Sequence, residues 1–263
     1  MTVRKWKVRM LPFYLEAPAT YLKQLHDHDE AKMIYQKIKK TDMYDQKLGL
    51  YLTSNPLDDE TLEIGRARAF TKGWLEREAC FMHMSYKYLI GMIKSGLYEE
   101  YFRDMKTAMP PFMDPEVYGR SPLENASFIA TSNNPNPKNH GRAFVARLTG
   151  TTSEAMTLMI LMMTGKTLFT FEDQVLKFKI HPILTYDFFD LNKEVSFKLF
   201  SKVNITIFNP ENKNTFDGLY PVEYQLKNAF DHVTIQGPTV DGHLAEQIRS
   251  GHFDHVRVTL RSK

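Results

Sequence analysis

Residues 156–180 read MTLMILMMTGKTLFTFEDQVLKFKI, and the hydrophobic period of the chain changes within this stretch. Met156 to Met163 is the longest apolar run of the chain, interrupted only by Thr157, and it closes a region in which apolar residues recur every three to four positions, as in helices. From Leu168 onward, apolar residues come in short alternating runs, as in strands. The pattern predicts an α+β chain, with a helical part over residues 1–165, a β-sandwich over residues 166–263 and a boundary near Gly165.

Helix start and stop signals are frequent in the first part. Asp29 is placed to begin one helix, and Gly96 is placed to end another that runs from Glu76 to Ser95. Two capping boxes predict further helices, with Ser121, Pro122 and Glu124 ahead of Phe128 and Ile129, and with Thr151 and Glu154 ahead of Met156 to Met163. Between these two helices, the Asn- and Pro-rich stretch 133–141 is predicted to be a surface loop.

In the second part, turn signals separate the alternating runs at the spacing of a β-sandwich. The turns are predicted at Asn209-Pro210, Asp217-Gly218 and Gly237-Pro238. The predicted strands contain Val175, Phe178 and Ile180, then Val195, Phe197 and Leu199, then Val203, Ile205 and Ile207, and finally Val256 to Leu260.

The composition narrows the class of protein. The 263 residues carry a formal net charge of +3, and no basic run is long enough or interleaved enough with aromatic residues to predict nucleic-acid binding. Met1 to Met10 alternates charged and apolar residues, unlike a signal peptide, and the apolar run 156–163 is too short to span a bilayer. The single cysteine, Cys80, excludes a disulfide within the chain and a cysteine-rich metal site. We therefore expect a soluble cytoplasmic protein without a metal site and without a membrane or nucleic-acid partner.

Two polar side chains interrupt the apolar stripe of the predicted helix from Glu76 to Ser95. Glu76 and His83 are seven residues apart, which is about two turns, so both project from the face that carries Cys80 and Tyr86. Burying either group without a partner costs about 1–3 kcal/mol. Either each is satisfied within the core, which helical spacing alone favours, or both face a polar ligand.

Three other segments carry polar chemistry. Gly65 to Trp74 offers two guanidinium groups, an aromatic pair and glycines that allow close approach of a ligand to the backbone. Leu148 to Ser153 is a hydroxyl-rich stretch at a helix N-terminus, where N–H groups and the helix dipole favour an anion. His140-Gly141 lies just before an extended segment that ends at Leu148. Taken singly, these segments are also typical of a solvated loop, a helix cap and a surface histidine.

Several motifs occur together at characteristic spacing. One segment contains Gly65-Arg66, Phe70, Gly73, Glu76, Ala79, Phe81 and His83. A second places His140-Gly141 eight positions ahead of Leu148-Thr149-Gly150-Thr151, and Asn209-Pro210 follows in the sheet part. Together they resemble, over nearly the whole chain, the inverting glycoside phosphorylases of glycoside hydrolase family ninety-four, which includes cellobiose phosphorylase. Tyr118 to Asn125 and Gly65 to Trp74 are most similar to the long members that act on β-1,2-linked glucooligosaccharides.

The resemblance implies a fold and a set of site residues. The fold would be the C-terminal part of an (α/α)6 barrel followed by a two-layer antiparallel β-sandwich. His83, Thr149 and Gly150 would bind the attacking phosphate, Glu76 would contact a hydroxyl of the acceptor sugar, and Phe70 would line that sugar subsite. These groups suit the chemistry, since phosphate is already an anionic nucleophile that needs hydrogen-bond donors rather than a carboxylate base.

The chain also departs from the family pattern. Leu75 stands where cellobiose phosphorylases have a lysine and Arg77 where they have an asparagine, so we expect the acceptor sugar to be held differently. Thr71-Lys72 replaces two prolines, which leaves the conformation of the loop open. The general-acid aspartate of the family lies more than a hundred residues before the His83 segment, farther than this sequence extends. Asp58-Asp59 does not match its motif, so no catalytic residue is assigned.

The sequence is therefore expected to be the C-terminal fragment of an inverting β-glucan or β-glucoside phosphorylase. It would use phosphate as a co-substrate to release glucose 1-phosphate, need no cofactor and be inactive alone. Its expected partners are a β-linked glucooligosaccharide, phosphate and an N-terminal half of the same enzyme, and a homodimer is left open. The alternative is a non-catalytic carbohydrate-binding or interaction module in which Trp74, Phe70 and Tyr86 stack on a glucan, and a purely structural helical and β protein is a third interpretation.

Overall fold

The computed structural model describes residues 10–145 and 149–263, and only the backbone of Thr149. Contacts divide the chain into two compact units, residues 1–157 (unit 1) and residues 158–263 (unit 2). Helix α6 (Thr149–Thr164) runs through this division, and Gly165 follows its last residue. The mixture of helices and largely antiparallel sheets confirms the α+β class.

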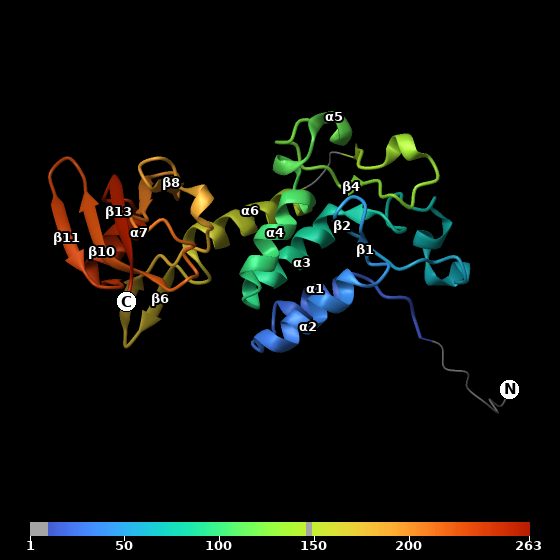
Figure 1. Ribbon diagram of the computed structural model, residues 1–263. Coiled ribbons are helices and arrows are strands. Elements are labelled where there is room, and N and C mark those ends of the chain that lie inside the picture. The colour runs from blue at the N-terminus through green and yellow to red at the C-terminus, as the bar shows by residue number, and fades with distance from the viewer. Residues whose placement is uncertain (1–9, 146–148) are drawn as a thin grey trace, which may run out of the picture. The chain divides into compact units, whose positions relative to one another are not determined.

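Unit 1 combines helices with short strands (Figure 1). Its helices, besides the start of α6, are α1 (Glu16–Leu22), α2 (His28–Lys39), α3 (Met82–Lys94), α4 (Tyr98–Ala108) and α5 (Pro115–Tyr118). Its strands are β1 (Tyr44–Asp45) paired with β2 (Leu50–Tyr51), and an antiparallel sheet of β3 (Cys80–Phe81), β4 (Phe128–Ile129) and β5 (Ala143–Phe144). Single turns of 3-10 helix lie at Leu62–Ile64, Arg66–Ala69, Pro110–Phe112 and Pro137–Asn139.

Helix α3 is the central helix of unit 1. It is apolar on nearly all sides and is buried along most of its length, as expected of a core helix. It packs against α1 and α4. The approach of α1 requires Gly91, because a Cβ at this position would lie 2.9 Å from the Cβ of Leu22. The helix ends as the sequence predicts, with Gly96 at a left-handed φ of +87°.

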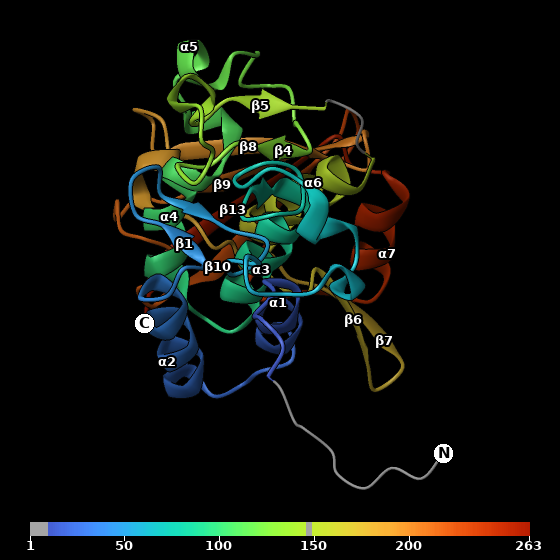
Figure 2. The same cartoon turned by 90° about the vertical axis from the view of Figure 1, so that its right-hand side faces the viewer.

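Three predicted helix starts are wrong. Helix α2 begins after Asp27, whose carboxylate, rather than that of Asp29, accepts hydrogen bonds from the first backbone N–H groups. Phe128-Ile129 does not form a helix but strand β4, which lies beside β5 (Figure 2). Helix α6 begins at Thr149, so Thr151 lies inside its first turn. For α2 a cap two residues upstream decides where the helix starts, and for Phe128-Ile129 the pairing of β4 with β3 and β5 replaces the helix.

A buried polar cluster around Asp104 joins α2, α4 and the β1–β2 hairpin. Asp104 is 3 % exposed and accepts hydrogen bonds from Lys39 Nζ at 3.2 Å and from the Tyr51 hydroxyl. The Lys39 ammonium also lies 3.4 Å from the centroid of the Tyr44 ring. The cluster therefore fixes β1 against the helices of unit 1.

Tyrosines of this region are expected to make unit 1 less stable at alkaline pH. Burial raises the pKa of Tyr35 and of Tyr44 to about 12, compared with about 10 in an unfolded chain. The folded state keeps protons that the unfolded state releases, so this stabilisation is complete below about pH 10 and is lost as the pH rises to about 12. The urea midpoint, followed by circular dichroism, should fall across this window. The Tyr35→Phe/Tyr44→Phe double variant should show a shallower fall, and an equal slope for both proteins would contradict the assignment.

Unit 2 contains the end of α6, two sheets and the helix α7 (Figure 1). The five-stranded sheet has the order β11-β10-β13-β9-β8 and the three-stranded sheet the order β12-β7-β6. The elements are β6 (Phe169–Glu172), β7 (Val175–Phe178), β8 (Glu194–Leu199), β9 (Val203–Phe208), β10 (Leu219–Lys227), β11 (His232–Gln236), β12 (Val240–Asp241), α7 (His243–Ser250) and β13 (His255–Ser262), with a 3-10 turn at Tyr186–Phe188. Within the described residues, no helix has both the length and the apolar composition that crossing a bilayer requires.

Both sheets and α7 contribute side chains to one core of unit 2, which includes Phe178, Ile205, Tyr224 and Ile248. The alternating runs lie on strands β7, β8, β9 and β13, which confirms the strand predictions. The expectation of an antiparallel arrangement throughout is wrong, since β9 pairs with β13 in parallel. Helix α7, which the sequence analysis did not predict, leads into β13, and strands joined by long connections of this kind can lie parallel.

Candidate functional site

The sheet β3-β4-β5 gathers the two segments that carry the predicted phosphate residues. Strand β3 leads directly into α3, so His83 is the second residue of that helix. Strand β5 precedes α6, and Gly150 is the second residue of that helix. Strand β4 lies between them, with Ile129 paired to Cys80 on one side and to Ala143 on the other. The order of the sheet thus explains why the two helix starts are neighbours.

The imidazole of His83 lies against Gly150. A Cβ added to Gly150 would be 3.2 Å from both Cε1 and Nδ1 of the ring. On the other edge of the ring, Nε2 lies 3.6 Å from Glu154 Oε1. The Phe81 and His83 rings are nearly perpendicular, with centroids 5.9 Å apart. Nδ1 is therefore on the side of the α6 N-terminus, where backbone N–H groups and the helix dipole favour an anion.

The charged groups near Glu154 include the imidazole of His83 and the ammonium of Lys23. Burial lowers the pKa of Lys23, and the charged neighbours of this ammonium are Glu154, Lys87 and Lys94. Lys87 also lies 3.9 Å from Glu16 Oε1, so this region contains carboxylates as well as ammonium groups. The sequence analysis missed the position of Glu154 because it assigned this residue to a capping box. Its separation of four residues from Gly150 places both on one face of α6.

Two residues that the sequence analysis singled out, Thr149 and Leu148, do not have a described side-chain position. The side chain of Thr149, the third predicted phosphate ligand, lies outside the described residues, and only its position as the first residue of α6 is known. Leu148, the predicted end of the extended segment, also lies outside them. The structure therefore brings together two of the three predicted phosphate residues, His83 and Gly150.

Glu76 is not on one helix with His83, and this prediction is wrong. Glu76 lies in a tight turn in which Trp74 and Arg77 exchange two backbone hydrogen bonds, of 3.2 and 3.1 Å. Glu78 then adopts a left-handed φ of +55°, which an α-helix does not accommodate, and strand β3 follows. The apolar periodicity continues upstream of α3, but helical structure does not.

Glu76 and Phe70 share a loop, residues 65–78. The Arg66 guanidinium holds the Glu76 carboxylate at both oxygens, with Nε donating to Oε2 at 3.0 Å and Nη2 to Oε1 at 2.5 Å. Phe70 is half-buried, and its carbonyl accepts a hydrogen bond from Arg77 Nη1 at 3.0 Å. The two predicted sugar residues are thus positioned by arginines of their own loop.

The buried guanidinium of Arg77 holds the loop together, a role that the sequence analysis did not predict. Its Nη1 donates to the carbonyl oxygens of Arg68 and Phe70, and its Nη2 donates to Asp58 Oδ1 at 2.9 Å. A hydrogen bond from Lys72, together with the charges of Lys72 and Arg77, holds the pKa of Asp58 below its ordinary value. Asp58 therefore acts as an ionised anchor of the loop and is unsuited to donate a proton.

A cavity of about 540 Å³ lies along the same loop. Its wall includes Lys72 and Glu78 from the loop, Tyr44 and Asp45 from β1, and Asn133. Glu78 is only 2 % exposed, so its carboxylate is buried within the wall of this cavity. No local sequence pattern predicts the burial of Glu78, because the groups that surround it come from distant segments.

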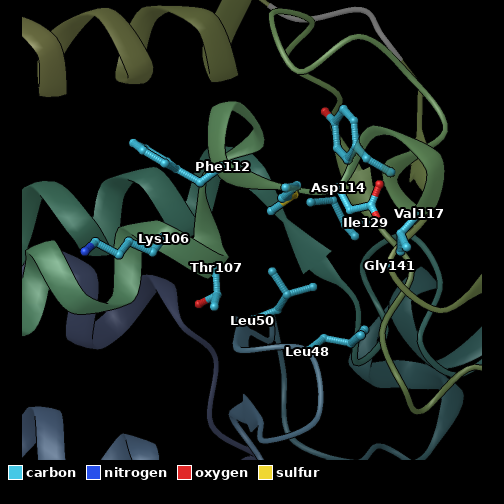
Figure 3. A pocket seen from close by; sticks show the side chains of 11 residues that line it. Leu48, Leu50, Lys106, Thr107, Phe112, Asp114, Val117, Ile129 and Gly141 are labelled. Atoms are coloured by element: carbon cyan, nitrogen blue, oxygen red, sulfur yellow. The ribbon is translucent and has the colours of Figure 1, made fainter.

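A second, smaller pocket of about 210 Å³ is largely apolar and lies between β2, β4 and the segment after α4 (Figure 3). Leu50, Phe112 and Ile129 contribute to its lining. Asp114, also in the lining, already accepts a hydrogen bond from the backbone N–H of Glu116 as the N-cap of α5. The lining includes none of the predicted site residues, and we interpret this pocket as a packing feature.

Comparison with known protein families gives one match. A sequence model of the glycosyl hydrolase 94 superfamily, catalytic domain, matches residues 17–165, which is more than half of the chain. A search of curated proteins found no match. The matched range contains the His83–Gly150 contact, the loop 65–78 and the cavity at Glu78.

Proposed function

The chain belongs to the glycosyl hydrolase 94 superfamily, a superfamily of carbohydrate-active enzymes, and on this basis we propose that it provides the phosphate and acceptor-sugar subsites of an inverting β-glucan or β-glucoside phosphorylase. In such a reaction phosphate attacks the anomeric carbon and glucose 1-phosphate is released. The leaving oxygen needs a general acid, whereas the nucleophile needs only donors and a positive field.

The contact between His83 and Gly150 carries the phosphate assignment. It supports a site in which one edge of the imidazole and the N–H groups at the start of α6 meet the same anion. Thr149, as the residue that begins α6, would supply a hydroxyl to the same anion.

The loop 65–78 would hold the acceptor sugar. A carboxylate fixed by a bidentate arginine, as Glu76 is by Arg66, keeps lone pairs available for a sugar hydroxyl, and the Phe70 ring offers an apolar face. The proposal assigns the general acid to another segment of the enzyme, because Asp58, Glu76 and Glu154 each already face a cation or an imidazole. Partners would then be phosphate, a β-linked glucooligosaccharide and the segment with the acid.

Substitution of the two proposed subsites should separate the two ligands. We expect His83→Ala to weaken binding of inorganic phosphate about tenfold or more, since one donor to a charged group is lost, while binding of a β-1,2-glucooligosaccharide is unchanged. Glu76→Ala should weaken binding of the β-1,2-glucooligosaccharide and leave binding of phosphate unchanged. Titration calorimetry of the whole chain with each ligand measures both effects.

His232→Ala is the matched control, because His232 is an exposed histidine on β11. Equal losses for both ligands in His83→Ala would contradict the phosphate assignment. Binding of the glucan without any binding of phosphate by the unchanged protein would favour the non-catalytic carbohydrate-binding module instead.

A further inference from the structure

The two ring nitrogens of His83 have different neighbours. Nδ1 lies on the side of Gly150, where an added Cβ would come within 3.2 Å of it, and Nε2 lies 3.6 Å from Glu154 Oε1. The side chain of His83 is 28 % exposed and that of Glu154 is 19 % exposed. Because both groups are partly buried, solvent and salt screen their interaction less than they screen an ion pair at the surface.

Helix α6 provides both the proposed anion site and this carboxylate. Glu154 follows Gly150 by four residues, so the two lie one turn apart on the face of α6 that meets His83. Backbone N–H groups at the start of α6 can therefore meet an anion beside Nδ1 while the carboxylate pairs with Nε2. A carboxylate near the start of a helix is also stabilised by the helix dipole, which is the purely structural interpretation of Glu154.

Only a protonated imidazole can donate to both neighbours. A neutral ring has one N–H group, so a ring that donates to Glu154 through Nε2 presents a lone pair at Nδ1, which repels an anion. The imidazolium ion donates at both nitrogens, and a carboxylate beside it stabilises this charged form. A carboxylate on one ring nitrogen also fixes the orientation of the ring, as it does in catalytic triads and metal sites.

The other charged groups of this region come from α1, from the residue that follows it and from α3: Glu16, Lys23, Lys87 and Lys94. Three of the four are ammonium groups, whose charge opposes the protonation of a nearby imidazole. The fourth, Glu16, lies 3.9 Å from the ammonium group of Lys87. Glu154 is the carboxylate that faces the ring itself, so the protonated state of His83 depends on it.

We propose that Glu154 is a positioning residue of the phosphate site: its carboxylate orients His83 through Nε2 and keeps the ring protonated, so that Nδ1–H donates to the anion. This role rests on the proposed function, because Glu154 acts on phosphate only through His83. The sign of the effect separates it from charge alone. Removing a carboxylate near an anion site would by charge alone strengthen anion binding, whereas removing this carboxylate should weaken it.

The test titrates inorganic phosphate and sulfate into the whole chain by calorimetry, at constant ionic strength and from about pH 5 to about pH 9. Sulfate keeps the same charge over this range, so its pH profile reports on groups of the protein alone. The variants are Glu154→Gln, Glu154→Asp, and Glu154→Gln combined with His83→Ala. Glu246→Gln is the matched control, because Glu246 lies 3.9 Å from an exposed histidine, His243, on α7.

We expect Glu154→Gln to bind both anions about tenfold more weakly at about pH 7, and to lose sulfate about one pH unit earlier as the pH rises. The difference should disappear toward acidic pH, where the ring is protonated without help from the carboxylate. Glu246→Gln should bind as the unchanged protein does, and in the His83→Ala protein Glu154→Gln should cause no further loss. If Glu154→Gln does not fold, Glu154→Asp decides, since withdrawing the carboxylate from Nε2 should shift the sulfate profile in the same direction.

Three results would overturn the positioning role and leave the proposed function intact. They are anion binding that is unchanged or tighter in Glu154→Gln, a loss of equal size at every pH, and a further loss in the His83→Ala background. If neither anion binds the unchanged protein, both the positioning role and the proposed phosphate site are overturned.

Discussion

Replacing Gly73 with alanine is expected to lower the free energy of unfolding of unit 1 by about 2–5 kcal/mol. Gly73 has a left-handed φ of +62°, and a Cβ there would lie 2.3 Å from the backbone nitrogen of Asn134. No side-chain rotation relieves a clash with backbone, so the loop 65–78 must separate from the segment 131–134. The hydrogen bond from Thr131 N–H to the Gly73 carbonyl, at 3.3 Å, would be lost as well.

Gly96→Ala is the matched control for this prediction. Gly96 also lies in unit 1 with a left-handed φ, but its Cβ would meet only a ring carbon of His28 at 3.6 Å, an ordinary contact. We expect this control to cost about 1 kcal/mol, the conformational penalty alone. Urea unfolding followed by tryptophan fluorescence reports on unit 1 through Trp74, whose ring packs against Phe144. Equal losses in the two variants would show that the loop does not need the close approach at Gly73.

The fold could be predicted where one local pattern was sufficient. Alternation over Val203, Ile205 and Ile207 allows only one face to be buried, so the strands of unit 2 were found. Helix α7 was missed because its eight residues bury only Ala245 and Ile248, too few to establish a helical period. The parallel pairing of β9 with β13 is set by segments about fifty residues apart and leaves no local trace.

The candidate site could be predicted only where residues follow a motif. His83 and Gly150 come from motif segments, and the structure places them in contact. The apolar spacing around Glu76 is compatible with a helix, but pairing of β3 with β4 competes with that helix and determines where α3 begins. The roles of Arg77 and Glu78 depend on hydrogen bonds to Asp58 and to the segment 131–134, which local spacing does not reveal.

Asp104→Ala is expected to destabilise unit 1 by about 3–5 kcal/mol, as is typical when one partner of a buried ion pair is removed. The carboxylate is 3 % exposed and is the common acceptor of Lys39 and Tyr51. Its loss leaves a half-buried ammonium over the Tyr44 ring without its anion.

The double variant Asp104→Asn/Lys39→Met separates the ion pair from the packing around it. Removing both charges leaves no uncompensated group, so we expect the double variant to lose less stability than the sum of the two single variants. Glu172→Ala is the control for an exposed pair, since Glu172 and Lys177 lie 3.0 Å apart at the surface of unit 2, and its effect should be small. Additive losses in the double variant would mean that Asp104 acts through packing and its bond to Tyr51, and that the charge of Lys39 does not require Asp104.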